Sequence, residues 1–341
     1  MPDWLGTSIS IGALLGVVVV EFANPLMACG TVIIASMRIL GLFFAAALAA
    51  NPRHGMELVM GPLPAIDHAR PLEIQVIDET QLEKYTRRKI TYLAEPGDRV
   101  PAWLLIPRGL KRKAPAMLCL HQTTKIGMDE PAGLGGKPNL QYARELAERG
   151  YVTIAPDYPN FGEYQFDPYS RGYASATMKG IVNHVRAVDL LSQMPEVDAK
   201  HIGVIGHSLG GHNSLFVAAF DPRIKAVVTS CGFNSFHKYM KGNLTGWSHK
   251  GYMPRIAEVY GKDPARMPFD FSDVLRAVRP RAVFINAPEN DSNFEVSGVR
   301  DAVVGAGQWK GLTAVYPRDA GHDFPPDVRE QAYRFLDRWL R

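Results

Sequence analysis

The feature that most constrains the fold of this chain is the turn Gly206-His207-Ser208-Leu209-Gly210-Gly211. It follows a strand-like run, His201 to Ile205, and opens a helical pattern that continues to Phe220. In a G-x-S-x-G turn the backbone is so tight that neither flanking glycine position can carry a side chain, and the serine is held in strained geometry with its hydroxyl exposed. Three small residues at a packed strand–helix junction are the alternative interpretation. The strand before and the helix after favour Ser208 as a nucleophile.

The composition indicates a globular protein with a substantial core. The chain has 341 residues, of which 46% are hydrophobic and 21% charged, and its formal net charge is +4. This length suits one large or two ordinary domains, and so mild a charge does not suggest nucleic-acid binding. Two basic triplets, Arg87 to Lys89 and Lys111 to Lys113, lie beside a strand-like run or in a turn, and we interpret them as solvated edges.

The first fifty residues differ from the rest and are interpreted as targeting sequence. Met37-Arg38, the apolar run Ile39 to Leu48 and then Ala49-Ala50 have the basic start, apolar middle and small-residue end of a secretory signal. We therefore expect cleavage near Ala50, a secreted or periplasmic protein, and Met37 as the true start. The alternative is a membrane anchor with two apolar spans, Leu5 to Val20 and Leu26 to Ala50. Neither clearly reaches the roughly 20 apolar residues that spanning needs, although Leu26 to Ala50 comes close if Arg38 is tolerated.

Two cysteines remain after that segment, Cys119 and Cys231. Both fall at the ends of expected core strands, where a free cysteine behaves as a small buried hydrophobe. No disulfide framework is implied, and no spacing of Cys and His predicts a structural metal.

The remaining chain divides into an arm and one domain. Residues 51–70 are punctuated by Pro and Gly and are expected to form a linker or an N-terminal arm, and residues 71–341 the domain. Arg88 to Leu93 and Val100 to Ile106 predict an antiparallel hairpin. Buried parallel strands, alternating with helical stretches that include Leu140 to Arg149 and a longer helix ended by Pro195, are predicted from apolar runs. These runs are Met117 to Leu120, Val152 to Ala155, Ile202 to Ile205, Ala226 to Thr229, Ala282 to Asn286 and Thr313 to Tyr316.

Residues 232–280 interrupt this alternation. They are rich in Gly, Pro and aromatic residues and predict an insertion over the carboxyl edge of the sheet, where open parallel sheets bind ligands. Trp247, between Gly246 and Ser248, is expected to be the most exposed aromatic residue of the insertion, with a buried structural tryptophan as the alternative.

From about Ile90 to Leu340 the chain resembles the alpha/beta-hydrolase superfamily. Four phrases carry the resemblance: Leu118-Cys119-Leu120-His121-Gln122, the run from Ala155 to Glu163, the run from Val197 to Gly211, and Ala320-Gly321-His322-Asp323-Phe324. The third resembles the branch that holds dienelactone hydrolases, acetyl xylan esterases and related exported esterases. Dienelactone hydrolases carry cysteine as the nucleophile, so Ser208 shifts the expectation to ordinary carboxylic esters.

The resemblance implies an α/β fold and an order of catalytic residues. The expected fold is a mostly parallel central sheet with helices on both faces and an insertion before the strand that delivers the acid. A serine hydroxyl needs a base to take its proton and a third group to fix the tautomer of that base. In this superfamily the chain order is Ser, acid, His.

His322 is the expected base, because it follows a strand and sits in a loop behind Gly321. Three other histidines follow Ser208. His237 and His249 precede every strong acid candidate on a later strand. His212 lies one helical turn beyond the nucleophile, and we expect it to point away from the tight turn that holds Ser208, the nucleophile elbow. Asp291 matches the position of the superfamily's acid, and Glu289, on the same turn, is its nearest rival.

The resemblance assigns the oxyanion donors to the backbone N–H groups of Gln122 and Leu209. His121 and His207 are interpreted as structural neighbours of the site. No cofactor and no metal are expected.

The leading functional hypothesis is an exported serine esterase that acts on a small-molecule or carbohydrate ester, for example an acetylated sugar. A peptidase of the prolyl-peptidase type and an inactive binding protein with the same fold are the alternatives. Contact with a membrane is expected only if the N-terminal segment stays uncleaved. Four aromatic residues are candidates for the substrate pocket, with a place in the core as the alternative: Phe161, Phe233, Trp247 and Phe324.

Overall fold

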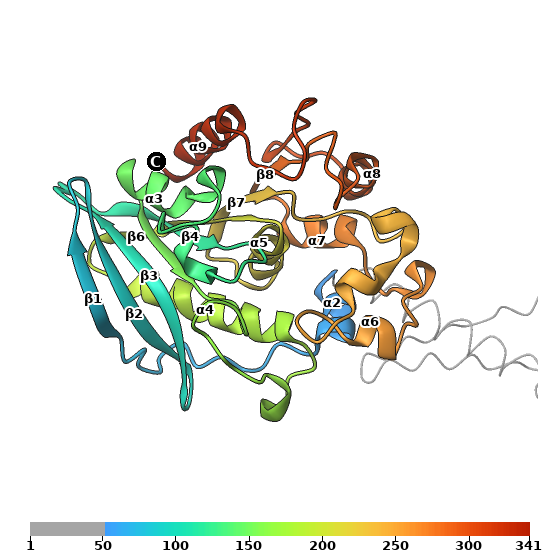
Figure 1. The fold of residues 1–341 in the computed structure, drawn as a ribbon, viewed down its shortest axis with the longest axis horizontal. Coiled ribbons are helices and arrows are strands. Elements are labelled where there is room, and N and C mark those ends of the chain that lie inside the picture. Colours follow the sequence, from blue (N-terminus) through green and yellow to red (C-terminus); the bar gives the residue numbers. More distant parts are fainter. Residues whose placement is uncertain (1–51) are drawn as a thin grey trace, which may run out of the picture. The chain divides into compact units, whose positions relative to one another are not determined.

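A nine-stranded mixed sheet runs through residues 52–341, the part of the chain that this computed structural model describes (Figure 1). Its spatial order is β1-β2-β3-β5-β4-β6-β7-β8-β9. The strands are β1 (Gln75–Gln81), β2 (Tyr85–Glu95), β3 (Asp98–Pro107), β4 (Ala114–Leu120), β5 (Val152–Pro156), β6 (Val197–His207), β7 (Ile224–Ser230), β8 (Ala282–Asn286) and β9 (Leu312–Val315). The predicted fold class, a mostly parallel sheet of the alpha/beta-hydrolase type, is confirmed.

The sheet is antiparallel from β1 to β5 and parallel from β5 through β4 to β9. The expected hairpin is β2–β3, and each predicted apolar run lies in a parallel strand. Every residue of β5 and of β8 is buried, as parallel strands require when helices cover both of their faces. β1 was not predicted, because its sequence QVIDETQ lacks an apolar face and all but one of its residues are exposed.

Helices cover the sheet on both faces. α3 and α9 pack on one face, and α4 and α5 on the other (Figure 1). The α-helices are α2 (Pro52–Met60), α3 (Tyr142–Glu148), α4 (Ala176–Gln193), α5 (Leu209–Phe220), α6 (Arg255–Glu258), α7 (Phe271–Val278), α8 (Val296–Ala306) and α9 (Pro326–Leu340). The short 3₁₀ helices are η1 (Gly127–Asp129), η2 (Pro138–Leu140), η3 (Tyr169–Arg171), η4 (Tyr239–Gly242), η5 (Leu244–Trp247) and η6 (Pro264–Arg266).

The segment expected to be a linker or an arm contains α2, which is part of the core. Met56, Val59 and Met60 are fully buried, and α2 packs on α4, α6 and α7. Gly55 allows this close packing, because a Cβ there would lie 2.4 Å from the carbonyl oxygen of Pro268. The helix therefore belongs to the domain.

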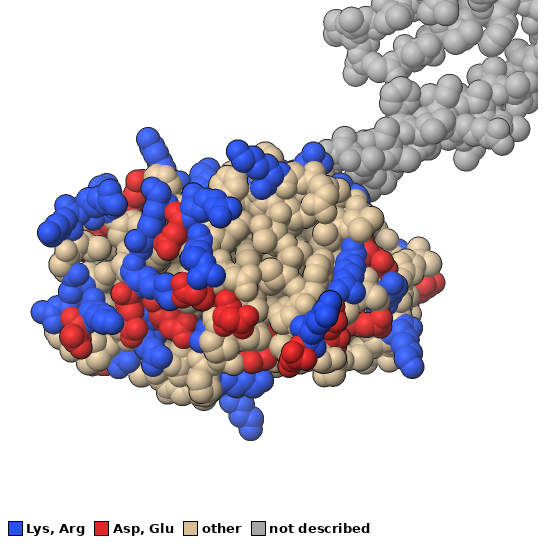
Figure 2. Space-filling view, turned by 90° about the horizontal axis from the view of Figure 1, so that it is seen from above, with Lys and Arg blue, Asp and Glu red and all other residues tan. Residues whose placement is uncertain are grey.

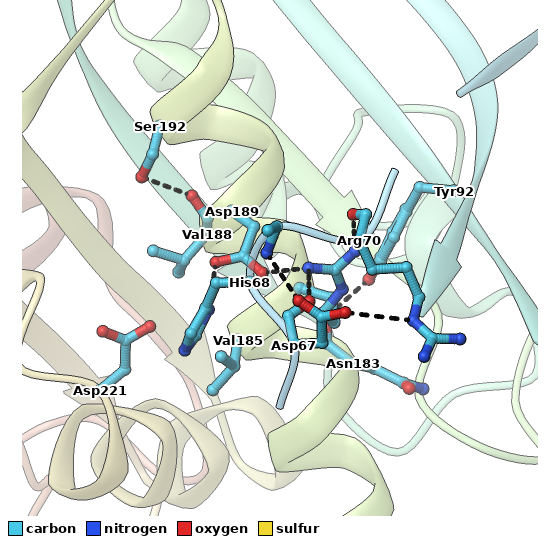
Figure 3. Close-up of polar contacts among 12 residues, drawn as sticks. Asp67, His68, Arg70, Tyr92, Asn183, Val185, Val188, Asp189, Ser192 and Asp221 are labelled. Carbon is cyan, nitrogen blue, oxygen red and sulfur yellow. Dashed lines mark hydrogen bonds and ion pairs between the residues drawn. The ribbon is translucent and has the colours of Figure 1, made fainter. Parts of the chain in front are cut away.

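The rest of the arm is fastened by a buried polar network on α4 (Figure 3). Arg186 donates to the carbonyl oxygens of Asp67 at 3.1 Å and Arg70 at 2.8 Å, and pairs with Asp189 at 2.5 Å. His68 Nδ1 lies 2.8 Å from the same Asp189 carboxylate. Because Arg186 and Asp189 are almost fully buried, the arm is held by charge-assisted hydrogen bonds that water screens little.

The segment expected as an insertion, residues 232–280, lies between β7 and β8 and holds four short helices and α7. Asp270 begins α7 with a reciprocal capping box in which Asp273 bonds back to the Asp270 amide. α7 packs on α5 and α8, so the last part of the segment is a covering helix of the domain.

Basic and acidic side chains are interspersed on the face shown in Figure 2. The triplet Lys111 to Lys113 is exposed between β3 and β4, as expected. The triplet Arg87 to Lys89 is not an edge, because β2 is paired on both sides. Its side chains are half-buried, with Arg88 2.6 Å from Glu79 and Arg87 over the ring of Trp103.

Cys119 and Cys231 are free and buried, as predicted. Between residues 52 and 341 no helix combines the length and apolar character that crossing a membrane would need. The predicted signal segment and its cleavage site near Ala50 lie outside the described residues.

A fully buried lysine joins α4 to the β2–β3 hairpin. Lys179 Nζ donates to Glu95 at 2.6 Å, to Asp98 at 2.5 Å and to Asn183 at 2.6 Å. The hydroxyl of Tyr164 donates to the second carboxylate oxygen of Asp98 at 2.8 Å. Lys179 is therefore the cation that balances a carboxylate removed from water.

Replacing this lysine with Lys179→Met should destabilise the fold by about 3–5 kcal/mol, because the buried Asp98 carboxylate would lose its counter-charge. Urea unfolding followed by circular dichroism measures the change. The exposed Lys200→Met is the matched control, with an expected change within about 0.5 kcal/mol. Equal stability of the two variants would contradict this role.

Candidate active site

Ser208 is the single residue between β6 and α5, and few residues adopt its backbone conformation. Its φ and ψ are 53° and −115°, and a non-glycine residue at positive φ is strained. The strand ends at His207 and the helix begins at Leu209, so the strand-to-helix turn predicted from the sequence is confirmed.

The two glycines of the turn are required by backbone contacts. A Cβ on Gly206 would lie 2.2 Å from the carbonyl oxygen of Gly210, and a Cβ on Gly210 would lie 1.9 Å from the carbonyl oxygen of Leu120. Both distances are far below any real contact. The turn therefore packs directly against the end of β4.

His322 and Asp291 form a hydrogen-bonded pair near the carboxyl ends of the neighbouring strands. His322 Nδ1 lies 3.0 Å from each carboxylate oxygen of Asp291. Asp291 follows β8 and is buried, and His322 lies between β9 and α9. An imidazole that donates through Nδ1 keeps the lone pair on Nε2, which is the tautomer that a proton acceptor needs.

The Asp291 carboxylate is stabilised in its charged form. Burial raises its pKa, but hydrogen bonds from His322 and from the amides of Asn293 and Phe294 outweigh burial and hold the pKa below its ordinary value. The rival carboxylate, Glu289, pairs instead with Arg300 at 2.9 Å. Asp291 is thus the carboxylate that the structure brings to the histidine.

Three polar contacts hold the loop that carries His322 in place. The Asp323 carbonyl oxygen accepts a hydrogen bond from Asn286 Nδ2 at 2.9 Å and contacts the thiol of Cys231 at 3.3 Å. The Asp323 carboxylate accepts from Asn139 Nδ2 at 2.7 Å. These contacts restrict where the imidazole can lie.

Ser208 and His322 line one cavity of about 380 Å³. Loops after β4 and β8 and the segment between β7 and β8 form its remaining walls. Its lining residues are Gln122, Thr123, Ser208, Leu209, His212, Tyr239, Gly246, Trp247, His249, Tyr252, Asn293, Phe294 and His322. Among residues 52–341 the Ser208 hydroxyl has no hydrogen-bond partner, as is common in such sites before substrate binds.

The two backbone amides named as oxyanion donors belong to residues of this cavity. Within the described part of the chain, neither the Gln122 nor the Leu209 N–H has a hydrogen-bond partner. The Gln122 side chain turns to Glu130, to which its Nε2 donates at 3.0 Å. The Gln122 side chain therefore leaves the Gln122 amide unpaired.

A buried histidine and a buried aspartate shape the loop after β4. His121 donates through Nδ1 to the Gln122 carbonyl oxygen at 2.6 Å and accepts from the Tyr158 amide at 3.0 Å. Asp157 accepts from the amides of Met128 and Glu163. Burial lowers the pKa of His121 to about 4, so this ring is neutral near neutral pH, and raises the pKa of Asp157 to about 7, so this carboxyl titrates there.

His212 does not point away from the elbow. It lines the same cavity as Ser208, and the expectation from the sequence was wrong. Every residue of α5 is buried, so the helix has no polar face from which the direction of a side chain could be predicted.

The four candidate pocket aromatics separate into two groups. Trp247 lines the cavity but is only 2% exposed, because the rings of Phe236, Phe271 and Phe294 pack around it; the expectation of an exposed tryptophan was wrong. Phe161 lines an adjoining cavity of about 330 Å³ that shares Thr123. Phe233 and Phe324 do not line the Ser208 cavity and are core residues.

One contact of the site was not predicted. The hydroxyls of Thr123 and Tyr252 lie 2.7 Å apart, which joins the loop after β4 to the segment between β7 and β8. No motif marks either residue, because the pair is formed by two loops that are 129 residues apart.

Three potential metal ligands also meet here. Ligand atoms of His207, Cys231 and His322 lie within 4.8 Å of one another. His322 Nδ1 is already bonded to Asp291, and burial raises the pKa of the Cys231 thiol well above its ordinary value. Burial lowers the pKa of His207 well below its ordinary value, so this imidazole is neutral.

Comparison with known proteins assigns the chain to a family. Residues 115–317 match the family described as alpha/beta hydrolase fold. A protein of Bacillus subtilis (strain 168) with the name "Putative hydrolase YtaP" is 24% identical over 319 residues, which are 86% of this chain and 100% of that protein.

Two solved structures share the fold. The glucuronoyl esterase from Solibacter usitatus has a TM-score of 0.64 at 18% identity, with 82% of this chain and 88% of that chain covered. The acetyl xylan esterase from Paenibacillus sp. R4 has a TM-score of 0.60 at 20% identity, with 80% and 90% covered. At these identities the likeness shows the fold alone.

Proposed function

Because the chain belongs to the alpha/beta hydrolase family, we propose that it hydrolyses carboxylic esters with Ser208 as nucleophile, His322 as base and Asp291 as the orienting acid. The observation that carries the proposal is the hydrogen bond between His322 Nδ1 and Asp291 at the cavity that also holds the strained serine. A serine elbow and an oriented imidazole at one cavity are the parts that acyl transfer needs.

In the proposed reaction His322 Nε2 takes the hydroxyl proton as Ser208 Oγ attacks the ester carbonyl carbon. The tetrahedral intermediate collapses when the imidazolium gives that proton to the leaving alcohol, and an acyl-serine remains. Water then attacks the acyl carbon with His322 as base, and the acid leaves. Asp291 stabilises the imidazolium in both halves of the reaction.

The negative charge of each tetrahedral intermediate falls on the former carbonyl oxygen. The unpaired amides of Gln122 and Leu209 are the proposed donors to this oxygen. The Leu209 amide is at the start of α5, where the positive end of the helix dipole adds to its effect. Loss of one such donor costs on the order of a hundred- to thousand-fold in turnover.

The substrate class is proposed from the cavity and from the structural neighbours. Two neighbours are named for esters of carbohydrates, and the cavity of about 380 Å³ is walled by Trp247, Tyr252 and Phe294. Aromatic rings interleaved with many uncharged polar groups suit a small, polar and neutral ester. A small-molecule or sugar ester is therefore the proposed substrate.

We also propose that the protein is exported, on the basis of the signal-like order from Met37 to Ala50. Amino-terminal sequencing of protein secreted by its host should read from about Asn51. An intact Met1 in a membrane fraction would instead support the anchored alternative.

Ser208→Ala should reduce the turnover of 4-nitrophenyl acetate on the order of a millionfold, because the oxygen that forms the bond to the substrate is lost. It should also abolish labelling by a fluorophosphonate probe. Ser192→Ala, on α4 and away from the cavity, is the matched control and should label normally. Ordinary turnover by folded Ser208→Ala would refute the assignment, and a wild-type protein that neither labels nor turns over would be a binding protein.

Asp291→Asn should reduce kcat on the order of ten-thousand-fold, because an amide no longer fixes the tautomer of His322. Glu289→Gln should stay within a few-fold of wild type, because Glu289 pairs with Arg300 and does not contact the histidine. Steady-state kinetics of the two variants distinguishes the carboxylates. A crippled Glu289→Gln beside an active Asp291→Asn would move the acid to Glu289.

A further inference from the structure

His212 is a second imidazole in the wall of the Ser208 cavity, and the proposed reaction does not use it. It lies one helical turn after the nucleophile, with its amide 3.2 Å from the Ser208 carbonyl oxygen. Only 4% of the residue is exposed, and it is one of the residues that line the cavity. Buried polar groups in proteins are as a rule hydrogen-bonded, so the partners of both ring nitrogens have to be identified.

The hydrogen bonding of this ring fixes its tautomer. His212 Nδ1 lies 3.2 Å from the Gly232 carbonyl oxygen. A carbonyl oxygen has only lone pairs, so Nδ1 must carry the hydrogen. Burial lowers the pKa of His212 to about 3, which keeps the ring neutral at working pH. The lone pair is therefore on Nε2.

No group among residues 52–341 donates to that lone pair. The Tyr252 hydroxyl faces Thr123, and the indole N–H of Trp247 has no hydrogen-bond partner either. The rings of Trp247, Tyr252 and Phe216 pack 4.8, 5.8 and 5.7 Å from the imidazole and hold its orientation. His212 Nε2 is not among the buried atoms without a partner, so this acceptor is open to the cavity, where a ligand can donate to it.

The charges of the cavity restrict which ligand can do so. Its lining contains no Asp, Glu, Lys or Arg. A substrate ammonium or carboxylate beside His212 would therefore lose part of its hydration without gaining a counter-charge from the lining, at a cost in free energy. A neutral hydroxyl carries a donor without that cost.

We infer that His212 Nε2 is the acceptor of a subsite that binds a hydroxyl group of the substrate, so that hydroxylated esters are preferred over their alkyl analogues. The inference rests on the proposed esterase function and narrows its substrate class to neutral, hydroxyl-bearing esters. His212 acts here in specificity and takes no part in proton transfer.

Matched ester pairs that exchange a hydroxyl for a methyl group test the subsite. Three pairs are used: 4-nitrophenyl lactate with 4-nitrophenyl 2-methylpropanoate, 4-nitrophenyl 3-hydroxybutanoate with 4-nitrophenyl 3-methylbutanoate, and 2-hydroxyethyl acetate with propyl acetate. They place the hydroxyl on the acyl or the alcohol side. The ratio of kcat/KM within each pair is divided by the ratio of alkaline hydrolysis rates, which removes intrinsic reactivity.

The wild-type protein should prefer the hydroxyl member of at least one pair by roughly ten-fold, the effect of one well-placed hydrogen bond. In His212→Phe, which keeps a ring but has no acceptor, this normalised ratio should fall to about one. His212→Gln can place an amide oxygen near the position of Nε2 and should keep part of the preference. The control is His237→Phe, at an exposed histidine of the segment 232–280, and it should retain the wild-type ratio.

Two outcomes of these measurements would contradict the inference. A wild-type ratio near one for all three pairs overturns it, as does a His212→Phe protein that keeps the wild-type preference. Should His212→Phe fail to fold, His212→Asn is measured in its place, because its amide can still donate to Gly232 but leaves no atom at Nε2. Hydrolysis without preference rejects the subsite alone, whereas absence of both hydrolysis and fluorophosphonate labelling rejects the esterase function and the subsite with it.

Discussion

The close backbone approach beneath Ser208 is the constraint on which the site depends. With Gly206 against Gly210 and Gly210 against Leu120, the nucleophile turn and the loop after β4 lie in direct contact. The first supplies the serine and the Leu209 amide, and the second supplies the Gln122 amide. One packing contact between two parallel strands thus sets the distance between the attacking atom and both proposed oxyanion donors.

Hydrogen bonds between buried polar groups position the other half of the site, which is the pair of Asp291 and His322. Asn286, at the end of β8, bonds to the loop of His322 and to the Ser230 hydroxyl, which in turn lies 2.9 Å from His207 Nδ1. The strand that leads to Asp291 and the loop that carries the base are therefore joined below the cavity. Asn286 Oδ1 and His207 Nε2 have no hydrogen-bond partner among residues 52–341, so the network is only partly satisfied.

The sequence was informative wherever a local rule applied. Apolar runs located all six parallel strands, and the order of Ser208, Asp291 and His322 along the chain selected the residues that the structure gathers at one cavity. Features that depend on distant partners were missed. The helix α2 is buried in part by the much later helix α7, and Trp247 by the rings of Phe236, Phe271 and Phe294. Helix α5 is covered on all sides, so periodicity gave no direction for His212.

The position of α2 has a consequence for how the domain is completed during synthesis. This helix is the first described element of the chain, yet Gly55 fits against Pro268 and the helix packs on α7. A ribosome must therefore translate as far as α7, well beyond α4, before the packing around Met56, Val59 and Met60 is complete. Until then part of the apolar face of α2 stays uncovered, so the first described helix of the domain is among the last of its elements to be fully packed.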